Sequence, residues 1–290
     1  MTWIAFTLLA AFSQAWRNAL QSKLSNHASV AGVTLARFLL SSPLSALYLV
    51  ALYQWQPAEA LSPSGSFLFY VFAASIMQIA ATALMVVLFK QNNYAVGAGL
   101  AKSEALVAAI LGMLFFGSTL SLLGWLGVAI GGLAVLLLSG FTLKNLNLKT
   151  ALIGLASGTA FALTSLWVRE ASISSGLPFP NSAAWVLLFV LLTQTVMLSA
   201  YISIKESHTW RTLLSHKPLT CAISFTSCIG SIGWFSAMSL QHVAYVKTLG
   251  QVEVFFTILL SIFWLKEPVK KRDGLGLGLI AVAAILVMMT

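Results

Sequence analysis

The sequence predicts an all-α membrane protein, with ten transmembrane helices arranged as two inverted five-helix repeats around a central cavity. Composition is the first reason: 59% of the 290 residues are hydrophobic and only 8% are charged. A soluble domain carries roughly 25% charged residues, so this chain has too little charge to cover a surface in water. The other two reasons are its long apolar runs and a carboxyl group that recurs at matching points of its two halves.

The apolar runs have the length of membrane helices. A helix needs about 20 mostly apolar residues to cross the hydrocarbon core, and barrel strands would be shorter and would alternate in polarity. Ten runs meet the requirement, approximately Trp3–Leu20, Ala31–Leu52, Phe67–Phe89, Ala95–Phe116, Leu120–Leu138, Ala151–Val168, Ala183–Ile204, Leu219–Leu240, Ala244–Trp264 and Gly274–Met289.

Short gaps and prolines fix how these runs follow one another. Lys90–Tyr94 and Gln241–Val243 leave only a few residues between neighbouring runs, so we expect antiparallel helices in one compact bundle. Pro43 stands inside the second run, where it removes a backbone hydrogen bond and predicts a kink.

The polar stretch Ser139–Thr150 divides the chain and leaves five runs on each side. We therefore expect a first repeat over residues 1–139, a linker over 140–150 and a second repeat over 151–290. Because five is odd, duplicated halves enter the membrane with opposite orientations, as in many secondary transporters with a site between the repeats.

One offset aligns the two halves. Moving the first half by 149 residues, the separation of Glu104 from Glu253, also superposes Gly127 on Gly276. Identity between apolar residues arises easily by chance. A coincident glutamate inside two otherwise apolar runs does not, so we interpret the halves as a duplication.

Net charge points to a lipid bilayer as the partner. The formal charge of +9 comes from 16 Lys and Arg against 7 Asp and Glu, mostly in the gaps between runs, where basic residues orient helices. No basic stripe with interleaved aromatic residues occurs in the sequence, so we do not expect nucleic-acid binding. The basic gaps follow odd-numbered runs, which predicts both termini outside the cell.

Glu104 and Glu253 are the most informative residues, because an ionisable group inside a membrane segment usually faces a cavity or a partner. Each stands about ten residues into its run, near the middle of the bilayer at about 1.5 Å per residue. We expect these carboxyl groups to bind a cationic group of a ligand or to carry a coupling proton. Structural pairing with another helix is the alternative.

Basic residues near these positions form a second candidate set. Lys102 and Lys247 begin the fourth and ninth runs, and Arg37 lies in the second. We expect a cationic cavity wall for an anionic group, or a structural partner for Arg37. For Lys247 the favoured alternative is that it extends to the membrane interface, where we also place Arg17.

Amides and one tryptophan complete the candidate site. The amides Gln14, Gln78, Gln194 and Gln251 either orient a ligand or join helices by hydrogen bonds, and joining is the favoured role for all but Gln251. Trp234 lies deep in the eighth run, where it either lines an aromatic cavity or packs against lipid.

The sequence predicts neither a cofactor nor a metal site. Cys221 and Cys228 stand seven residues apart in one run, and we interpret both as buried small hydrophobic residues. No phosphate-binding loop or catalytic constellation is visible, so we do not expect an enzyme.

Several motifs resemble the EamA-like branch of the drug/metabolite transporter superfamily. They are Leu35–Leu40 (LARFLL), Ile262–Pro268 (IFWLKEP) and the glycine-bearing stretch Gly274–Gly278 (GLGLG). The first half departs from the family, since Phe116–Ser118 stands where the second half has the family's Leu-x-Glu marker.

The resemblance implies ten helices, alternating access around a central cavity, and often export. It also implies termini inside the cell, which conflicts with the distribution of basic residues. We expect a secondary transporter, monomeric or homodimeric, that exports a small amino acid-like, nucleobase-like or drug-like metabolite across a bacterial inner membrane. An uncoupled channel and a non-transporting scaffold or receptor are the alternatives.

Overall fold

The computed structural model describes residues 1–90, 101–138, 148–260 and 271–290, although not the side chains of 271–273. Most of the predicted linker, the gap after Lys90 and the Ile262–Pro268 motif lie outside the described residues. All regular secondary structure in the described ranges is helical, so the predicted all-α class is confirmed.

The helices of the first half overlap the predicted runs. They are α1 (Thr2–Ser25), α2 (Val30–Phe38), α3 (Ser41–Trp55), α4 (Gly65–Phe89), α6 (Glu104–Phe115) and α7 (Leu122–Leu138).

The second half adds one short helix, α10, that the apolar runs did not predict. Its helices are α8 (Leu148–Ser174), α9 (Asn181–Lys205), α10 (His208–Ser215), α11 (Lys217–Leu240), α12 (Val243–Gly250), α13 (Glu253–Leu260) and α14 (Lys271–Met288).

Six helical segments of the described chain are long and apolar enough to cross a bilayer. They are Val30–Trp55, Gly65–Phe89, Leu148–Ser174, Asn181–Lys205, Lys217–Leu240 and Val243–Leu260. Large apolar side chains such as Leu47, Phe69 and Val196 are exposed on the outside of the bundle, where lipid and not water is a favourable surround. The chain is an integral multi-pass membrane protein.

Three helical runs are interrupted, and two of the interruptions precede a glutamate. The kink predicted at Pro43 is a break between α2 and α3 at Leu39 and Leu40, because a proline in the first turn of α3 cannot continue the preceding helix. Two-residue turns also precede Glu104 at the start of α6 and Glu253 at the start of α13. Both carboxylates therefore stand at helix N-termini, where the helix dipole favours negative charge.

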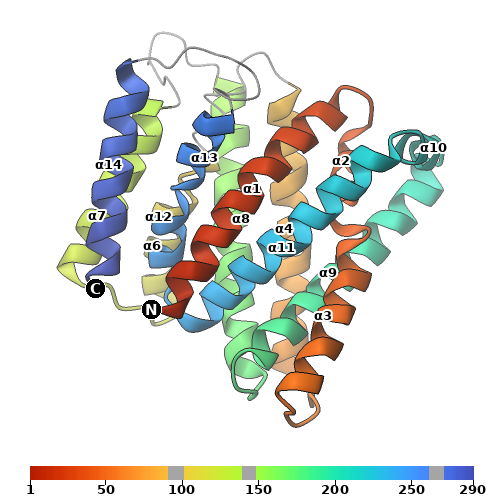
Figure 1. The fold of residues 1–290 in the computed structure, drawn as a ribbon, viewed down its shortest axis with the longest axis horizontal. Coiled ribbons are helices and arrows are strands. Elements are labelled where there is room, and N and C mark those ends of the chain that lie inside the picture. Colours follow the sequence, from red (N-terminus) through yellow and green to blue (C-terminus); the bar gives the residue numbers. More distant parts are fainter. Residues whose placement is uncertain (91–100, 139–147, 261–270) are drawn as a thin grey trace.

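Figure 1 shows that helices of the two halves interleave in one bundle. The α1 helix packs along α11, α4 along α8, α7 along α14, and α3 along α9. Each of these pairs joins one helix from either side of the central linker. The main buried cluster, which includes Phe38, Phe67, Leu166 and Phe235, likewise draws on both halves.

Glycines allow α7 and α14 to approach closely. A methyl group added at Gly127 would meet Val287 Cγ1 at 2.8 Å and the carbonyl oxygen of Ala283 at 3.1 Å. One added at Gly276 would collide with the side chain of Leu138. These glycines therefore serve packing within the chain.

One expectation about the cysteines is wrong. Cys228 is buried, as predicted, but Cys221 is exposed, and both are free. A spacing of seven residues drifts by about 20° on a straight helix, and in α11 that small rotation separates a packed side chain from an outward one.

We predict that Gly127→Ala lowers the stability of the bundle by about 1–3 kcal/mol, because the added methyl group must force α7 away from the backbone of α14. Thermal melting of the purified protein in detergent measures the loss. Gly132→Ala is the matched control on the same helix, since nothing lies within 4 Å of its added methyl group. Equal melting temperatures for the two variants would contradict the packing described above.

Candidate functional site

A polar cavity lies inside the bundle, lined by residues of both halves. Its polar lining residues come from α1, α2, α4, α8, α11 and α12, together with Lys102 and Glu104 near the start of α6: Gln14, Arg17, Asn18, Gln21, Arg37, Gln78, Thr82, Lys102, Glu104, Thr164, Ser165, Ser231, Trp234 and Lys247.

One face of α1 supplies four of these side chains. Gln14, Arg17, Asn18 and Gln21 stand at positions i, i+3, i+4 and i+7, a spacing that places them on the same side of a helix. All four line the cavity. This polar stripe inside an apolar helix is the sequence signal that could have identified Asn18 and Gln21, which the analysis of single residues missed.

Glu253 lies at the centre of a network that joins the two halves. It forms an ion pair with Lys102 and accepts a hydrogen bond from Gln14 Nε2. Its second oxygen accepts from Asn18 Nδ2 at 2.7 Å. Three donors from the first half therefore hold this carboxylate, whose side chain is 4% exposed.

Glu104 forms the second ion pair, with Lys247 of the opposite half. Lys247 Nζ lies 3.3 Å from Glu104 Oε2 and 4.3 Å from the centroid of the Trp234 ring, which is the geometry of a cation–π contact. Trp234 Nε1 in turn donates to Gln14 Oε1 at 2.9 Å. Trp234 and Gln14 thus connect the Glu104 pair to the Glu253 network.

The two arginines of the cavity have neutral partners. Arg17 Nη2 donates to Asn18 Oδ1 at 2.9 Å, and Arg37 Nη1 donates to Thr82 Oγ1 at 2.6 Å. Both arginines are 3% exposed. Among the described residues, no carboxylate oxygen lies within 4 Å of either guanidinium group. The ion pairs there are Lys102–Glu253 and Lys247–Glu104.

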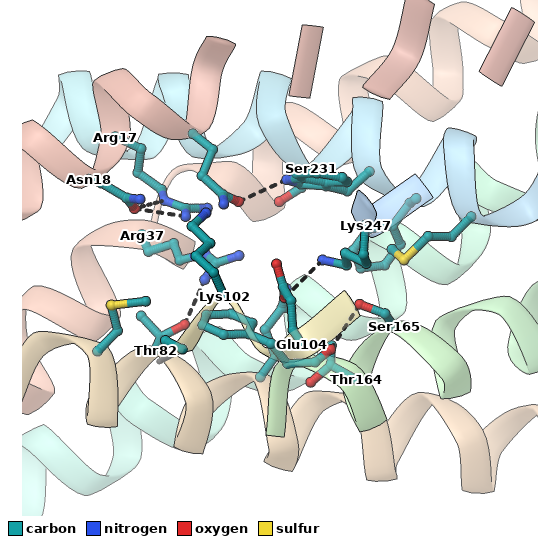
Figure 2. Close-up of a pocket in the computed structure, with 18 of the residues that line it drawn as sticks. Arg17, Asn18, Arg37, Thr82, Lys102, Glu104, Thr164, Ser165, Ser231 and Lys247 are labelled. Carbon is teal, nitrogen blue, oxygen red and sulfur yellow. Dashed lines mark hydrogen bonds and ion pairs between the residues drawn. The ribbon is translucent and has the colours of Figure 1, made fainter. Parts of the chain in front are cut away.

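The cavity network therefore carries more positive than negative charge. Its cations are Arg17, Arg37, Lys102 and Lys247, and its carboxylates are Glu104 and Glu253. Figure 2 shows Arg17, Arg37 and Lys102 on one side of the cavity, with Glu104 and Lys247 on the other. Both carboxylates are paired with lysines, so neither arginine has a carboxylate partner of its own.

The structure brings most of the predicted site residues together. The lining includes Glu104, Lys102, Gln78, Lys247, Trp234 and Arg37, and Glu253 adjoins it through Lys102. Gln78 also has the structural role considered for it, because its Oε1 accepts from Gln194 Nε2 of α9 at 2.7 Å.

Two expectations for individual residues are wrong, and a third residue is not part of the cavity lining. Lys247 is 6% exposed and ion-paired, and Arg17 is 3% exposed, so neither extends to a membrane interface. A cation extends to the interface when the interior offers it no counter-ion or acceptor, and here Glu104 and Asn18 supply them. Gln251 lies away from the cavity, with its side-chain amide against Gly131 of α7.

Nothing in the described ranges forms a metal site of three or more His, Cys, Asp or Glu residues. What the cavity offers instead is a set of charged and hydrogen-bonding groups in a buried space, with Phe161, Phe235 and Met238 between them. Such an arrangement is typical of a site that binds a small molecule, in which a few polar groups orient a ligand between apolar walls.

We predict that Glu104→Gln destabilises the protein more than Lys247→Gln. Breaking a buried pair costs about 3–5 kcal/mol when the remaining charge is uncompensated. Loss of Glu104 leaves Lys247 alone and raises the excess of positive charge, whereas loss of Lys247 leaves a carboxylate that also attracts Arg17 and Arg37.

Thermal melting of the two variants and of the double variant checks this order. The double variant should lose less than the sum of the single losses, because the pair acts as a unit. Lys217→Gln, on an exposed residue, controls for removal of one positive charge. Additive losses would contradict coupling between Glu104 and Lys247. A larger loss for Lys247→Gln would contradict the predicted order of the two variants.

The chain resembles known proteins in the sequence of its second half and in its fold. Residues 148–289 match the EamA-like transporter family, and no curated protein matches the chain at a significant level. Among solved structures, one entitled only "Crystal structure of protein" matches with a TM-score of 0.69 and 15% identity, covering 98% of both chains. That likeness concerns the fold alone. Through its second half, the chain is similar to the EamA-like transporter family of the drug/metabolite transporter superfamily.

Proposed function

We propose that the chain is a secondary transporter that exports a small metabolite across a bacterial inner membrane by alternating access. In this proposal residues 1–139 and 151–290 are inverted five-helix repeats that move against each other around the cavity. The observation that carries it is a buried polar cavity whose two ion pairs, Lys102–Glu253 and Lys247–Glu104, both cross between the halves.

Helix bounds in the described ranges support the duplication. The offset of 149 residues moves α7 (Leu122–Leu138) onto residues 271–287, and α14 spans Lys271–Met288. The same offset moves α1 onto residues 151–174, inside α8 (Leu148–Ser174), and moves α4 onto residues 214–238, largely inside α11 (Lys217–Leu240). Glu104 and Glu253, which define the offset, both follow a two-residue turn.

Packing between helices obeys the same exchange. If α1 becomes α8 and α4 becomes α11, the pair α1 with α11 becomes α8 with α4, and both pairs are observed. The pair α2 with α11 likewise becomes α9 with α4, which also pack together. An architecture related by an internal two-fold axis has this property, since the axis must map each interface onto another or onto itself.

Single residues at the α7–α14 interface repeat the pattern. Gly127 packs against Val287, and Gly276 packs against Leu138. The offset of 149 residues carries Gly127 onto Gly276 and Leu138 onto Val287, so each contact is the image of the other. This interface lies on the proposed axis and supports α7 and α14 as the scaffold about which the halves move.

The crossing ion pairs suggest how movement is controlled. Separation of the halves would expose Glu104 and Glu253 to water or leave their lysines unpaired, and an unpaired buried charge is costly. A substrate group or a proton that satisfies these charges lowers that cost. Protonation of either glutamate would release its lysine. This release is the basis of our second proposal, that transport is coupled to protons.

The two alternatives make different demands on the cavity. A non-transporting scaffold requires paired glutamates and a sealed interior; the pairing is observed, but a polar cavity is present as well. An uncoupled channel requires a continuous path between the two sides of the membrane. The scaffold accounts for the pairing but not for the polar cavity, so we favour the transporter.

Counterflow in proteoliposomes tests alternating access. A panel of radiolabelled amino acids, nucleobases and organic acids should contain a compound whose entry is accelerated several-fold by unlabelled compound inside the vesicle. A carrier exchanges faster than it returns empty, because the empty site must reorient without compensation of its charges. A channel gives equal entry with and without internal compound, and this result would reject the carrier mechanism.

Proton coupling predicts that Glu104→Gln or Glu253→Gln abolishes the dependence of flux on a pH gradient, because a glutamine side chain does not take up or release a proton. Flux of the compound found by counterflow is measured with and without the gradient. Glu59→Gln removes an exposed carboxylate and should leave the dependence intact. Unchanged pH dependence in both cavity variants would eliminate coupling through these residues.

A further inference from the structure

We propose that the substrate of this site carries an anionic group, a carboxylate or a phosphate, which binds to Arg17 and Arg37. The inference rests on the proposed transport function and narrows its substrate to organic anions. It excludes the cationic and neutral drug-like compounds that the sequence leaves open.

Unused hydrogen-bond donors are the first reason. Arg17 Nη1 and Arg37 Nε are buried and have no hydrogen-bond partner in the described part of the chain. A guanidinium group carries five N–H donors in a planar fork and cannot lose its charge in a protein. Donors left unsatisfied at such depth are costly, and both residues line the same cavity.

Charge balance is the second reason. Both carboxylates of the network are already engaged: Glu253 by Lys102, Gln14 and Asn18, and Glu104 by Lys247. The two arginines remain as a buried excess of two positive charges. They also repel each other electrostatically. An anion bound between them would remove both penalties, whereas a cationic substrate would increase them.

Fixed orientation is the third reason. Asn18 holds Arg17 through two hydrogen bonds of 3.3 and 2.9 Å, and Thr82 holds Arg37 at 2.6 Å. The Arg37 guanidinium group also lies 5.2 Å from the ring centroid of Phe38 and 5.9 Å from that of Phe161. Figure 2 shows both arginines on one side of the cavity, and planar guanidinium forks match the geometry of carboxylate and phosphate oxygens.

The rest of the cavity wall indicates that the substrate also has an apolar part. Met85, Phe161, Trp234, Phe235 and Met238 line the same cavity. Aromatic and thioether side chains favour an organic body over a bare hydrated ion such as inorganic phosphate. The site therefore fits a small acid with an apolar or aromatic portion.

Four compounds that share one ring and differ in charge test the inference directly. Purified protein in detergent is melted with phenylacetate, phenyl phosphate, benzylamine or benzyl alcohol at constant ionic strength, because a ligand that binds the folded protein raises its melting temperature. We expect at least one acid to stabilise the protein and the amine and alcohol to have no effect. The relative effects of the two acids decide between carboxylate and phosphate.

Arginine variants locate the binding site. Arg17→Gln and Arg37→Gln should each weaken the apparent affinity for the effective acid by about tenfold or more, the value of one charge-assisted hydrogen bond. Arg211→Gln, on an exposed residue, removes the same charge outside the cavity and should change nothing. If the glutamine variants do not fold, Arg17→Lys and Arg37→Lys replace them; they keep the charge and should weaken binding by a smaller factor.

Two results would overturn the inference. One is a set of melting temperatures in which benzylamine or benzyl alcohol stabilises the protein as much as the acids do, or in which neither acid stabilises it. The other is acid binding that the Arg17 and Arg37 variants leave unchanged. Failure of the transport proposal is a separate outcome. An acid that binds through both arginines but shows no counterflow would reject transport and keep the anion site. Counterflow of a cation would support transport and reject the anion site.

Discussion

Burial of charge in a bundle that is otherwise apolar is the constraint on which the rest of the structure depends. Lys102 with Glu253 and Lys247 with Glu104 are buried ion pairs, and each takes one partner from either half. A buried pair does not add much stability by itself, because desolvation offsets the attraction, but loss of one partner is costly. The pairs therefore specify how the halves meet more than they strengthen the bundle.

Helix interruptions make this pairing possible. Glu104 and Glu253 each begin a helix after a two-residue turn, so the helix dipole favours the charge that the carboxylate brings. The interruptions also provide polar backbone inside the bundle, where irregular backbone is tolerated only if protein or a cavity covers it. Close packing at Gly127 and Gly276 holds α7 and α14 together, so the pairs can separate while a scaffold stays in place.

The same constraint explains the composition of the cavity. Neutral polar groups, such as Asn18 and Thr82, support the charged ones without neutralising them. The result is a site whose carboxylates are satisfied by lysines and whose arginines are not satisfied by any carboxylate of the described residues. In the transport cycle that we propose, a ligand that completes the charge balance would stabilise the occupied cavity.

Local patterns in the sequence were sufficient for the fold class and for much of the site. Apolar runs of membrane length determine the helices, and Pro43 determines the break between α2 and α3, because both effects act within a few residues. Intramembrane glutamates and lysines were identifiable because burial of a charge is costly wherever it occurs. The stripe of Gln14, Arg17, Asn18 and Gln21 was also visible in the sequence, but only as a helical face and not residue by residue.

Tertiary structure alone decided which charges meet. Lys102 pairs with Glu253 and not with Glu104, two residues away, and Lys247 pairs with Glu104; such contacts depend on how distant helices pack. The same holds for Lys247 and Arg17, whose flexible side chains could reach either an interface or the interior. The sequence by itself determined that charges must be buried somewhere in this bundle, and the packing of its halves determined where, because the energy of a buried charge depends on neighbours that lie far away along the chain.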